Sequence, residues 1–406
     1  MTSLPTPRFL DRVTPPHNTT LILLAGIGAL TTNIFLPSLP SMAEYFRTDY
    51  QTMQLSVALY LVMAALGQVI IGPVSDRFGR RPVMLWSIAL FLLATAGCLL
   101  ARDVWVFLGF RMAQAVVIAG FVLSRAAIRD MVPGSQAAAK IAYVTMGMSL
   151  VPMASPMLGG AMGQAFGWQS IFVLLLAAGF LVFWISWRDM GETLARREGG
   201  MAAQINQYPE LLTSRYFWGY CLAATFASGT FFAYLGGAPF IGATTYKLPP
   251  ALLGLYFGAP SMGYLIGNFI SGRYSVRFGL DRMLLAGILC SAGGLSLALL
   301  MDASGHGSAG VFFGAMSLVG VGNGLLLPNA NAGMLSVRPQ LAGSAAGLGG
   351  AISIGGGAGL SVLATHLLGP ETGAGPLLLL MLCCVALSCL SVLWVIGGAR
   401  NAPESI

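Results

Sequence analysis

The stretch GQVIIGPVSDRFGRRPVML, residues 67–85, decides how the rest of the chain is interpreted. Only 9% of the 406 residues are charged, yet Asp76, Arg77, Arg80 and Arg81 fall close together here, between two apolar runs. Hydrophobic residues make up 56% of the sequence. Charge-free runs recur at about 20 residues, the length of a helix that crosses a bilayer core of ~30 Å. The stretch is therefore predicted to be a charged turn between two membrane-spanning segments.

The apolar runs are continuous and lack the alternation of a membrane barrel, so the spans are predicted to be helices. The segment 141–187 contains no charge over 47 residues, which is too long for one span, and GQAFGWQS supplies a turn within it. Charges and Pro/Gly clusters thus predict an all-α integral membrane protein with twelve transmembrane helices. The expected spans are 18–40, 52–74, 82–101, 104–128, 137–163, 168–187, 215–241, 250–272, 281–301, 309–330, 341–365 and 376–397.

The distribution of basic residues predicts the orientation in the membrane. An even number of spans places both termini on one side, and with the N-terminus in the cytoplasm seventeen of the 21 basic residues are cytoplasmic. The net charge of +7 then reflects topology and attraction to anionic lipid, rather than binding to nucleic acid. Residues 1–17 are polar and Pro-rich, so no cleavable signal is expected. The six cysteines lie in predicted spans without metal-ligand spacing, and neither a metal nor a cofactor is predicted.

An internal repeat divides the chain. At an offset of 200 residues, GPVSDRFGRRPVML (72–85) matches GRYSVRFGLDRMLL (272–285) at six positions, among them Gly79 and Gly279. The longest polar interruption, residues 188–214, lies between spans six and seven. We therefore expect an N-terminal six-helix bundle (1–187), a cytoplasmic linker (188–214) and a C-terminal bundle (215–406). Parallel repeats of this kind are related by a pseudo-two-fold axis along the membrane normal, with the binding site between the halves.

These features resemble the major facilitator superfamily. The duplicated GPVSDRFGRRPVML motif is accompanied by FRMAQAVVIAG in span four, GMSLVPMASPMLGG in span five, GETL after span six, FAYLGGAPF in span seven and GNGLLLPNANAG in span ten. Together they resemble the drug:proton antiporters of the bicyclomycin and chloramphenicol resistance group (Bcr/CflA-like). The resemblance implies a multidrug efflux transporter of the bacterial inner membrane, working as a monomer by alternating access, with a small-molecule substrate and protons as the coupling ion.

The same resemblance gives the opening motif a role in gating. In the family the aspartate that matches Asp76 faces a helix N-terminus in the other half and locks the outward-facing state; here the start of span eleven, or Arg338 just before it, is the expected target. Gly72 and Gly79 are expected to allow close backbone approach at a tight turn, while Arg80 and Arg81 anchor the loop on the cytoplasmic side. The predicted gating residues are Gly72, Asp76, Arg77, Gly79, Arg80, Arg81 and Arg338.

Span five carries VPMASPMLGGAMG, a combination of helix-kinking and small residues. Proline removes a backbone hydrogen bond, and small residues allow a neighbouring helix to approach closely. A helix pivot for the rocking of the two bundles is therefore predicted at Pro152, Pro156, Gly159 and Gly160, although static packing would use the same residues.

Arg111 is the most informative single residue, because a cation inside a span is costly and should face the bundle interior or a water-filled cavity. Gln114, three residues on, shares its helix face. Asn33 in span one is expected at a similar depth, at a place where drug antiporters of this group usually carry an acid. Neither arginine nor asparagine can carry a coupling proton. The remaining candidates are Asp76 and Asp130 at the cytoplasmic rim.

An unneutralised Arg111 predicts a cavity that favours neutral, zwitterionic or anionic amphiphiles over lipophilic cations. Adaptable apolar and aromatic side chains with a few polar groups complete the expected lining. The predicted cavity residues are Asn33, Arg111, Gln114, Met146, Met148, Phe231, Tyr234, Tyr256 and Asn323.

Other classes of function fit the sequence less well. A membrane enzyme would need clustered intramembrane acids, histidines or nucleophiles, and the sequence offers none, so no catalytic residue is predicted. A facilitator or uptake porter for a small polar metabolite, without proton coupling, stays open because the acid in span one is missing.

Overall fold

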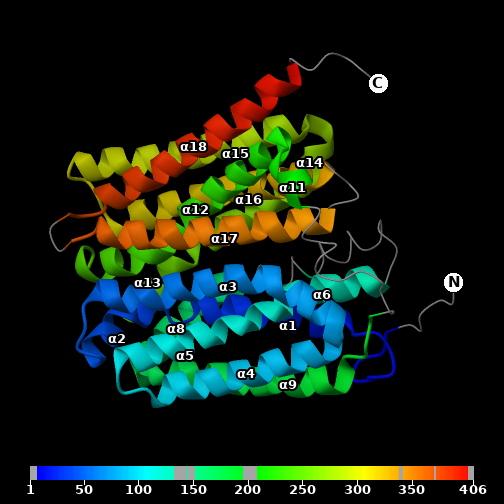
Figure 1. Cartoon of the computed structure of the whole chain (residues 1–406). Helices are drawn as coiled ribbons and strands as arrows, with labels where there is room; N and C mark the ends of the chain where they lie inside the picture. The colour runs from blue at the N-terminus through cyan, green and yellow to red at the C-terminus, as the bar shows by residue number, and fades with distance from the viewer. Residues whose placement is uncertain are drawn as a thin grey trace. The chain divides into compact units, whose positions relative to one another are not determined.

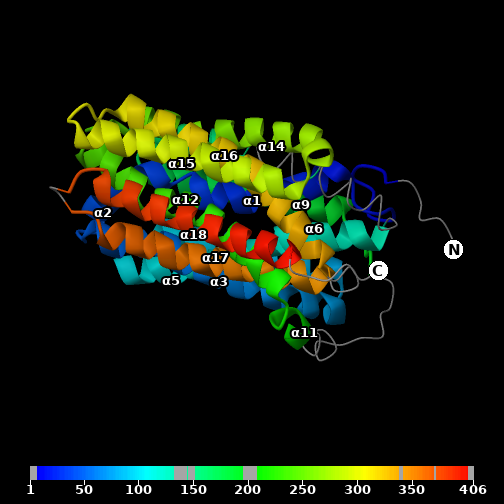
Figure 2. The same ribbon diagram turned by 90° about the horizontal axis from the view of Figure 1, so that it is seen from above.

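The computed structural model describes residues 7–131, 144, 151–194, 208–337, 342–369 and 372–400. The chain divides into two compact units, residues 1–203 with 250–254, and residues 204–249 with 255–406. In the described parts of both units all regular structure is helical (Figure 1). Within each unit the long helices run lengthwise beside one another in both views (Figures 1 and 2).

The first unit begins with α1 (Asn18–Asn33), a 3-10 turn (Leu36–Ser38) and α2 (Leu39–Tyr45). It continues with α3 (Tyr50–Phe78), α4 (Arg80–Leu100), α5 (Val104–Gln114), a second 3-10 turn (Ala115–Val117), α6 (Ile118–Met131), α8 (Val151–Phe166) and α9 (Gln169–Asp189). The second unit contains α11 (Tyr208–Leu212), α12 (Arg215–Thr244), α14 (Ala259–Phe278), α15 (Leu280–Ala303), α16 (Ala309–Ser336), α17 (Ala342–His366) and α18 (Gly375–Arg400). Helix α13 (Pro250–Phe257) includes residues assigned to both units.

The residue types before several helices explain where those helices begin. Asp49, Asp103, Ser214 and Ser308 each accept a hydrogen bond from a backbone N–H in the first turn of α3, α5, α12 and α16. Hydrogen bonds from the Thr52 side chain and backbone hold the pKa of Asp49, which lies outside the spans, below its ordinary value. The charged form of Asp49 therefore caps α3 at neutral pH, and this contribution to stability fades as the pH falls through the lowered pKa.

The described residues include ten helices or helix pairs that are long and apolar enough to cross a membrane. They coincide with ten of the twelve predicted spans, with ends that differ by a few residues. Predicted span five falls partly on residues outside the described ranges, and α8 covers its second half. Predicted span eight is formed by α13 and α14, which are separated at Gly258.

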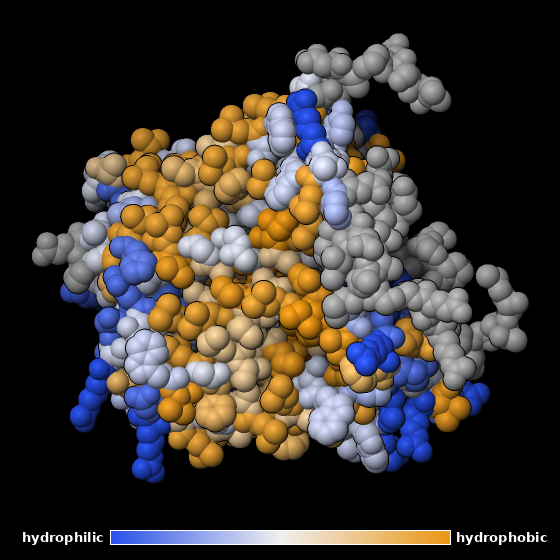
Figure 3. Space-filling model, in the orientation of Figure 1, coloured by the Kyte–Doolittle hydropathy of each residue, from blue (hydrophilic) through white to orange (hydrophobic). Residues whose placement is uncertain are grey.

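Apolar side chains form much of the outer surface of these helices, as expected for contact with lipid. Trp86, Leu100, Phe269 and Leu289 are each more than 70% exposed. Figure 3 shows hydrophobic residues covering the middle of one face, with hydrophilic residues gathered toward the helix ends. The protein therefore presents to lipid a surface that water would disfavour.

The repeated motif has the same backbone geometry in both copies. Gly79 follows α3 with φ of 96°, and Gly279 follows α14 with φ of 81°. The N–H of each glycine donates to a serine carbonyl four residues earlier, Ser75 or Ser275, at 2.9 Å. A positive φ of this size favours glycine, which explains why this residue recurs at the turn.

The expectation that Gly72 lies at the tight turn is wrong, whereas its part in gating stays a prediction. Gly72 lies inside α3, and among the described residues nothing would contact a Cβ atom added there within 4 Å. The turn begins seven residues later, so close approach explains Gly79 but not Gly72.

Replacing Gly79 with alanine is expected to lower the melting temperature more than the matched change Gly279→Ala. Both changes place a side chain at positive φ, which costs on the order of 1–3 kcal/mol. Only at Gly79 would the added Cβ also meet the Glu192 carboxylate, 2.5 Å away; among the described residues it meets nothing at Gly279. Thermal unfolding of the two purified variants measures the difference, and equal losses would contradict a role for the Glu192 contact.

Candidate functional site

Arg80 is the centre of a charged cluster at the end of the first unit where α3 ends and α4 begins. The sequence suggested that Arg80 anchors the loop on the cytoplasmic side, and the structure buries this residue, which is only 3% exposed. One guanidinium nitrogen lies 2.6 Å from Asp76, and Nε donates to Asp130 at 3.1 Å. A third nitrogen donates to the hydroxyl of Ser75. The buried arginine is stable here because each of its three guanidinium nitrogens lies beside an acceptor oxygen.

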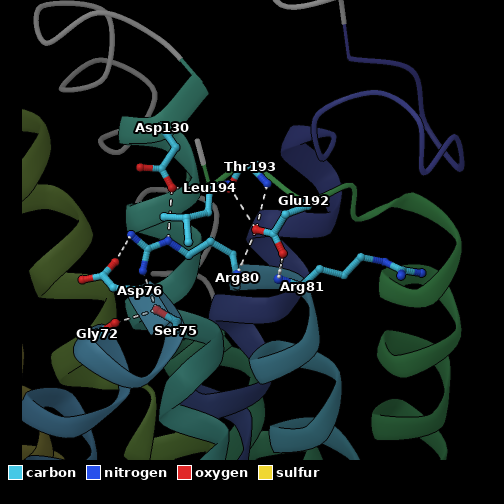
Figure 4. Close-up of polar contacts among 9 residues, drawn as sticks. All are labelled: Gly72, Ser75, Asp76, Arg80, Arg81, Asp130, Glu192, Thr193 and Leu194. Carbon is cyan, nitrogen blue, oxygen red and sulfur yellow. Dashed lines mark hydrogen bonds and ion pairs between the residues drawn. The ribbon is translucent and has the colours of Figure 1, made fainter. Parts of the chain in front are cut away.

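The two carboxylates bound by Arg80 differ in environment. The Asp76 side chain, on α3, is 30% exposed, whereas that of Asp130, on α6, is 6% exposed. The hydroxyl of Thr193 also donates to Asp130 at 3.4 Å. Figure 4 shows both carboxylates turned toward the Arg80 guanidinium from different helices. The cluster thus ties the end of α3, the start of α4 and the end of α6 through charge.

Glu192, which lies in the segment that follows α9, caps the N-terminal end of α4. Its carboxylate accepts hydrogen bonds from the backbone N–H groups of Arg80 at 2.9 Å and Arg81 at 3.2 Å (Figure 4). The first N–H groups of a helix lack partners within it, and the positive end of the helix dipole favours an anion there. Arg81 extends toward α9, where its side chain donates to the carbonyl of Trp187 at 3.1 Å. Arg77, in contrast, is exposed and contacts the ring of Phe78.

Arg111 forms a second polar centre, inside the helices of the first unit. The side chain is 1% exposed and lies between the rings of Phe35 and Tyr60, with 4.3 Å from Cζ to each ring centre. Nε donates to the Ser56 carbonyl at 3.2 Å and Nη2 to the Thr31 carbonyl at 2.9 Å. Among the described residues no carboxylate lies within ion-pair distance of Arg111. The charge is therefore held by neutral oxygens and aromatic faces.

Gln114 and Asn33, two of the predicted cavity residues, lie in the same region. Nη1 of Arg111 donates to the Gln114 amide oxygen at 2.8 Å, and the Gln114 amide nitrogen donates to Thr95 on α4 at 2.8 Å. Asn33 is 5% exposed, and its amide donates to the Ala29 carbonyl one turn earlier at 2.7 Å. Thr31, whose carbonyl binds Arg111, is two residues from Asn33. The structure therefore joins α1, α3, α4 and α5 around Arg111.

The predicted residues of the second unit form an aromatic group with one unusual polar atom. Tyr234 is 1% exposed, stacks on Phe231 and packs against Phe257 and Phe313. Its hydroxyl has no hydrogen-bond partner in the described part of the chain. Tyr256 stacks on Phe313 with 5.1 Å between ring centres. A buried hydroxyl without a partner costs roughly 1–3 kcal/mol, so it is a candidate to bind a polar group.

Asn323 on α16 donates to the hydroxyl of Thr230 on α12 at 3.2 Å. Asn323 is 6% exposed, so the structure places this amide between two helices of the same unit.

The predicted pivot lies on α8. Pro156 is inside this helix, and both Gly159 and Gly160 are buried. A Cβ at Gly159 would collide with the carbonyl of Ile34, so α8 approaches the end of α1 more closely than any larger residue would permit. Pro152 is the second described residue of α8.

Three predicted residues, Met146, Met148 and Arg338, lie outside the described ranges, as does the first residue of the segment expected to meet Asp76. Residues that the sequence reasoning missed include Ser75, Glu192, Phe35 and Tyr60. The sequence does offer a signal for Glu192, because this residue belongs to the GETL motif that follows span six.

Comparisons with known proteins identify the family of the chain. The model of the Major Facilitator Superfamily matches residues 21–362. An uncharacterized transporter of this superfamily type from Bacillus subtilis, YdgK, is 33% identical over 62% of this chain and 64% of its own length. The chain thus spans just under two thirds of that relative. The chloramphenicol resistance protein of Pseudomonas aeruginosa is 29% identical over 79% of this chain and 76% of its own length.

A solved structure shares the fold at low sequence identity. The xylose transporter XylE of E. coli, in a partially occluded inward open conformation, superimposes with a TM-score of 0.73 and 14% identity. The match covers 96% of this chain and 98% of XylE.

Proposed function

The chain belongs to the major facilitator superfamily and is a multi-pass membrane transporter rather than an enzyme, and on this premise we propose that it exports drugs. The proposed substrates are small neutral, zwitterionic or anionic amphiphiles that resemble chloramphenicol or bicyclomycin. They would move by alternating access, and the protein would act as a monomer in the bacterial inner membrane. The printed name of the Pseudomonas aeruginosa relative supports this class of substrate.

The observation that carries the proposal is the buried charge of Arg111. Charged residues inside membrane proteins are costly and usually mark substrate or ion pathways. Arg111 is bound by carbonyl and amide oxygens, and no described carboxylate neutralises it. Its positive charge would repel a lipophilic cation and attract an electron-rich or anionic group. Asn33 and Gln114 are proposed to share this part of the substrate path.

The aromatic group of the second unit is proposed to supply the apolar part of the lining. The rings of Phe231, Tyr234 and Tyr256 offer adaptable contact surface, as promiscuous binding cavities do. The Tyr234 hydroxyl, which lacks a partner, is proposed to accept or donate a hydrogen bond to a substrate. The proposed lining also includes Asn323 and the undescribed Met146 and Met148.

The Arg80 cluster is proposed to be the gate and the site of proton coupling. Arginine cannot release its proton and asparagine does not titrate, which leaves Asp76 and Asp130 as the carriers. Both carboxylates bind Arg80, so a proton on either would weaken the contacts that join α3, α4 and α6. Gly79, Arg77, Arg81 and Arg338 are proposed to assist this gate, and Gly72 by the family resemblance alone. Pro152, Pro156, Gly159 and Gly160 would form the pivot.

The orientation is proposed from charge. Placing both termini in the cytoplasm puts seventeen of the 21 basic residues on that side, in agreement with the positive-inside tendency.

A second candidate function has its own support. Transport of a small polar metabolite by a facilitator or uptake porter would need no proton carrier in the bundle. Asn33, at a position where the drug antiporters usually have an acid, favours this alternative.

Accumulation of labelled chloramphenicol in bacteria stripped of their own exporters separates the two functions. Cells that express the protein are expected to hold less drug at steady state, and a protonophore should restore the level of cells without it. An unchanged steady state with faster equilibration would contradict proton-driven export and favour the facilitator. A variant with Arg80→Gln serves as the inactive control.

A further inference from the structure

The N-terminal segment 8–17 is held against the end of α9 by one buried carboxylate. Asp189, the last residue of α9, is fully buried and accepts hydrogen bonds from the backbone N–H groups of Leu10 at 2.6 Å and His17 at 2.9 Å. Gly191, two residues on, has no room for a side chain. A Cβ there would lie 2.8 Å from the Arg12 carbonyl and 2.6 Å from the Thr14 carbonyl. The segment therefore packs at a defined position against the end of α9.

A pocket of about 380 Å³ lies between this segment and the end of α9. Its walls are Leu10, Asp11, Arg12, Val13, Trp187 and Arg188. Among the described residues, the guanidinium groups of Arg12 and Arg188 have neither an ion pair nor a hydrogen-bond partner. The Asp11 carboxylate accepts a hydrogen bond from the Val13 N–H at 3.1 Å, within its own turn. The lining thus carries two cations against one anion.

Exposed apolar side chains belong to the pocket lining, Val13 and Trp187, or to residues close to it in the sequence, Phe9 and Trp184. Val13 is 83% exposed, Phe9 48%, Trp184 49% and Trp187 46%. Tryptophan is enriched at the level of lipid headgroups, and α9 is a membrane-length helix that ends here. A soluble anion would satisfy the arginines but would leave these apolar groups uncovered. A lipid would cover both.

We propose that this pocket binds the headgroup of an anionic phospholipid, such as phosphatidylglycerol. Arg12 and Arg188 contact the phosphate, and the acyl chains lie along Val13 and Trp187. The identity of the leaflet rests on the orientation proposed above, but the binding site itself does not. None of the lining residues contacts the Arg80 side chain, although the carbonyl of Trp187 accepts a hydrogen bond from the neighbouring Arg81 at 3.1 Å.

The test measures lipid binding by the purified full chain. Native mass spectrometry follows the titration of phosphatidylglycerol and of phosphatidylcholine with the same acyl chains. The variant Arg12→Gln/Arg188→Gln is expected to lose about ten-fold in phosphatidylglycerol affinity, a modest value for two cations at an anionic surface, with phosphatidylcholine unchanged. The matched control Arg47→Gln/Arg102→Gln removes two exposed arginines elsewhere and should bind as the wild type does.

The Gly191→Ala variant shows whether lipid binding depends on the shape of the pocket or only on the charge of its two arginines. This change keeps both arginines but displaces the N-terminal segment from its position against α9, so the affinity for phosphatidylglycerol should fall as well. The inference is overturned if the double variant binds phosphatidylglycerol as the wild type does. It is also overturned if inorganic phosphate stabilises the protein as much as vesicles of phosphatidylglycerol do. Binding is measured without transport, so a failure of drug export leaves this result independent.

Discussion

Replacement of Arg80 with glutamine is expected to reduce transport at least ten-fold and to destabilise the first unit. The change removes the cation that Asp76 and Asp130 share, so the nearly buried Asp130 carboxylate loses this contact. Removing one partner of a buried ion pair typically costs 3–5 kcal/mol. Because Asp76 is partly exposed to solvent, we expect about 2–4 kcal/mol here. The measurements are thermal unfolding in detergent and drug accumulation in cells.

Two further variants show whether charge is the cause. Arg77→Gln removes an exposed arginine of the same motif that contacts only a ring in the described structure, and it should leave the melting temperature nearly unchanged. The double variant Arg80→Gln/Asp130→Asn removes the Asp130 charge as well and should recover part of the lost stability. Transport should stay low in the double variant, because the proposed proton carrier is gone. If Arg80→Gln unfolds at the same temperature as the wild type, the structural role of the cluster is contradicted.

The contrast between Arg80 and Arg77 also shows what the sequence could predict. Hydropathy and charge predicted the spans, because the length of an apolar run is a local property. The repeat at 200 residues predicted a duplicated turn, and its geometry recurs at Gly79 and Gly279. Burial of Arg80 depends on Asp130 and Glu192, which are distant in the sequence and meet it only in the fold. Three neighbouring arginines with the same apparent role therefore have different surroundings.

Arg111 shows a second limit of the same kind. The sequence predicted that Arg111 faces the interior of the bundle or a cavity and that Gln114 shares its helix face, and in the structure Arg111 is buried and donates to Gln114. The partner of the charge was sought among carboxylates, but the structure supplies the Ser56 and Thr31 carbonyls and two aromatic rings. Backbone carbonyls are present at every residue, so no sequence pattern distinguishes the ones that become ligands.

Restoring an acid with Asn33→Asp is expected to broaden export toward lipophilic cations. The change places a carboxylate two residues from Thr31, whose carbonyl already binds Arg111. A negative group there would offset the arginine charge and add a side chain that titrates within the first unit. We expect export of a quaternary ammonium dye such as ethidium to rise by about ten-fold, which corresponds to roughly 1.4 kcal/mol. Dye efflux from cells, measured before and after a protonophore is added, gives both the rate and its dependence on the proton gradient.

The control is Asn33→Leu, which removes the amide without adding charge. Asn33 donates one hydrogen bond, to the Ala29 carbonyl, and its loss should cost about 1 kcal/mol in both variants. A gain of dye export in Asn33→Asp alone therefore reports the carboxylate and not a loosened helix. If the aspartate variant keeps the wild-type specificity while folding normally, residue 33 does not act on substrates, and the selectivity proposed for Arg111 loses its main support. If the dye is exported equally well by the wild type, Arg111 does not exclude cations, because its charge is already screened by Phe35, Tyr60 and the carbonyl oxygens.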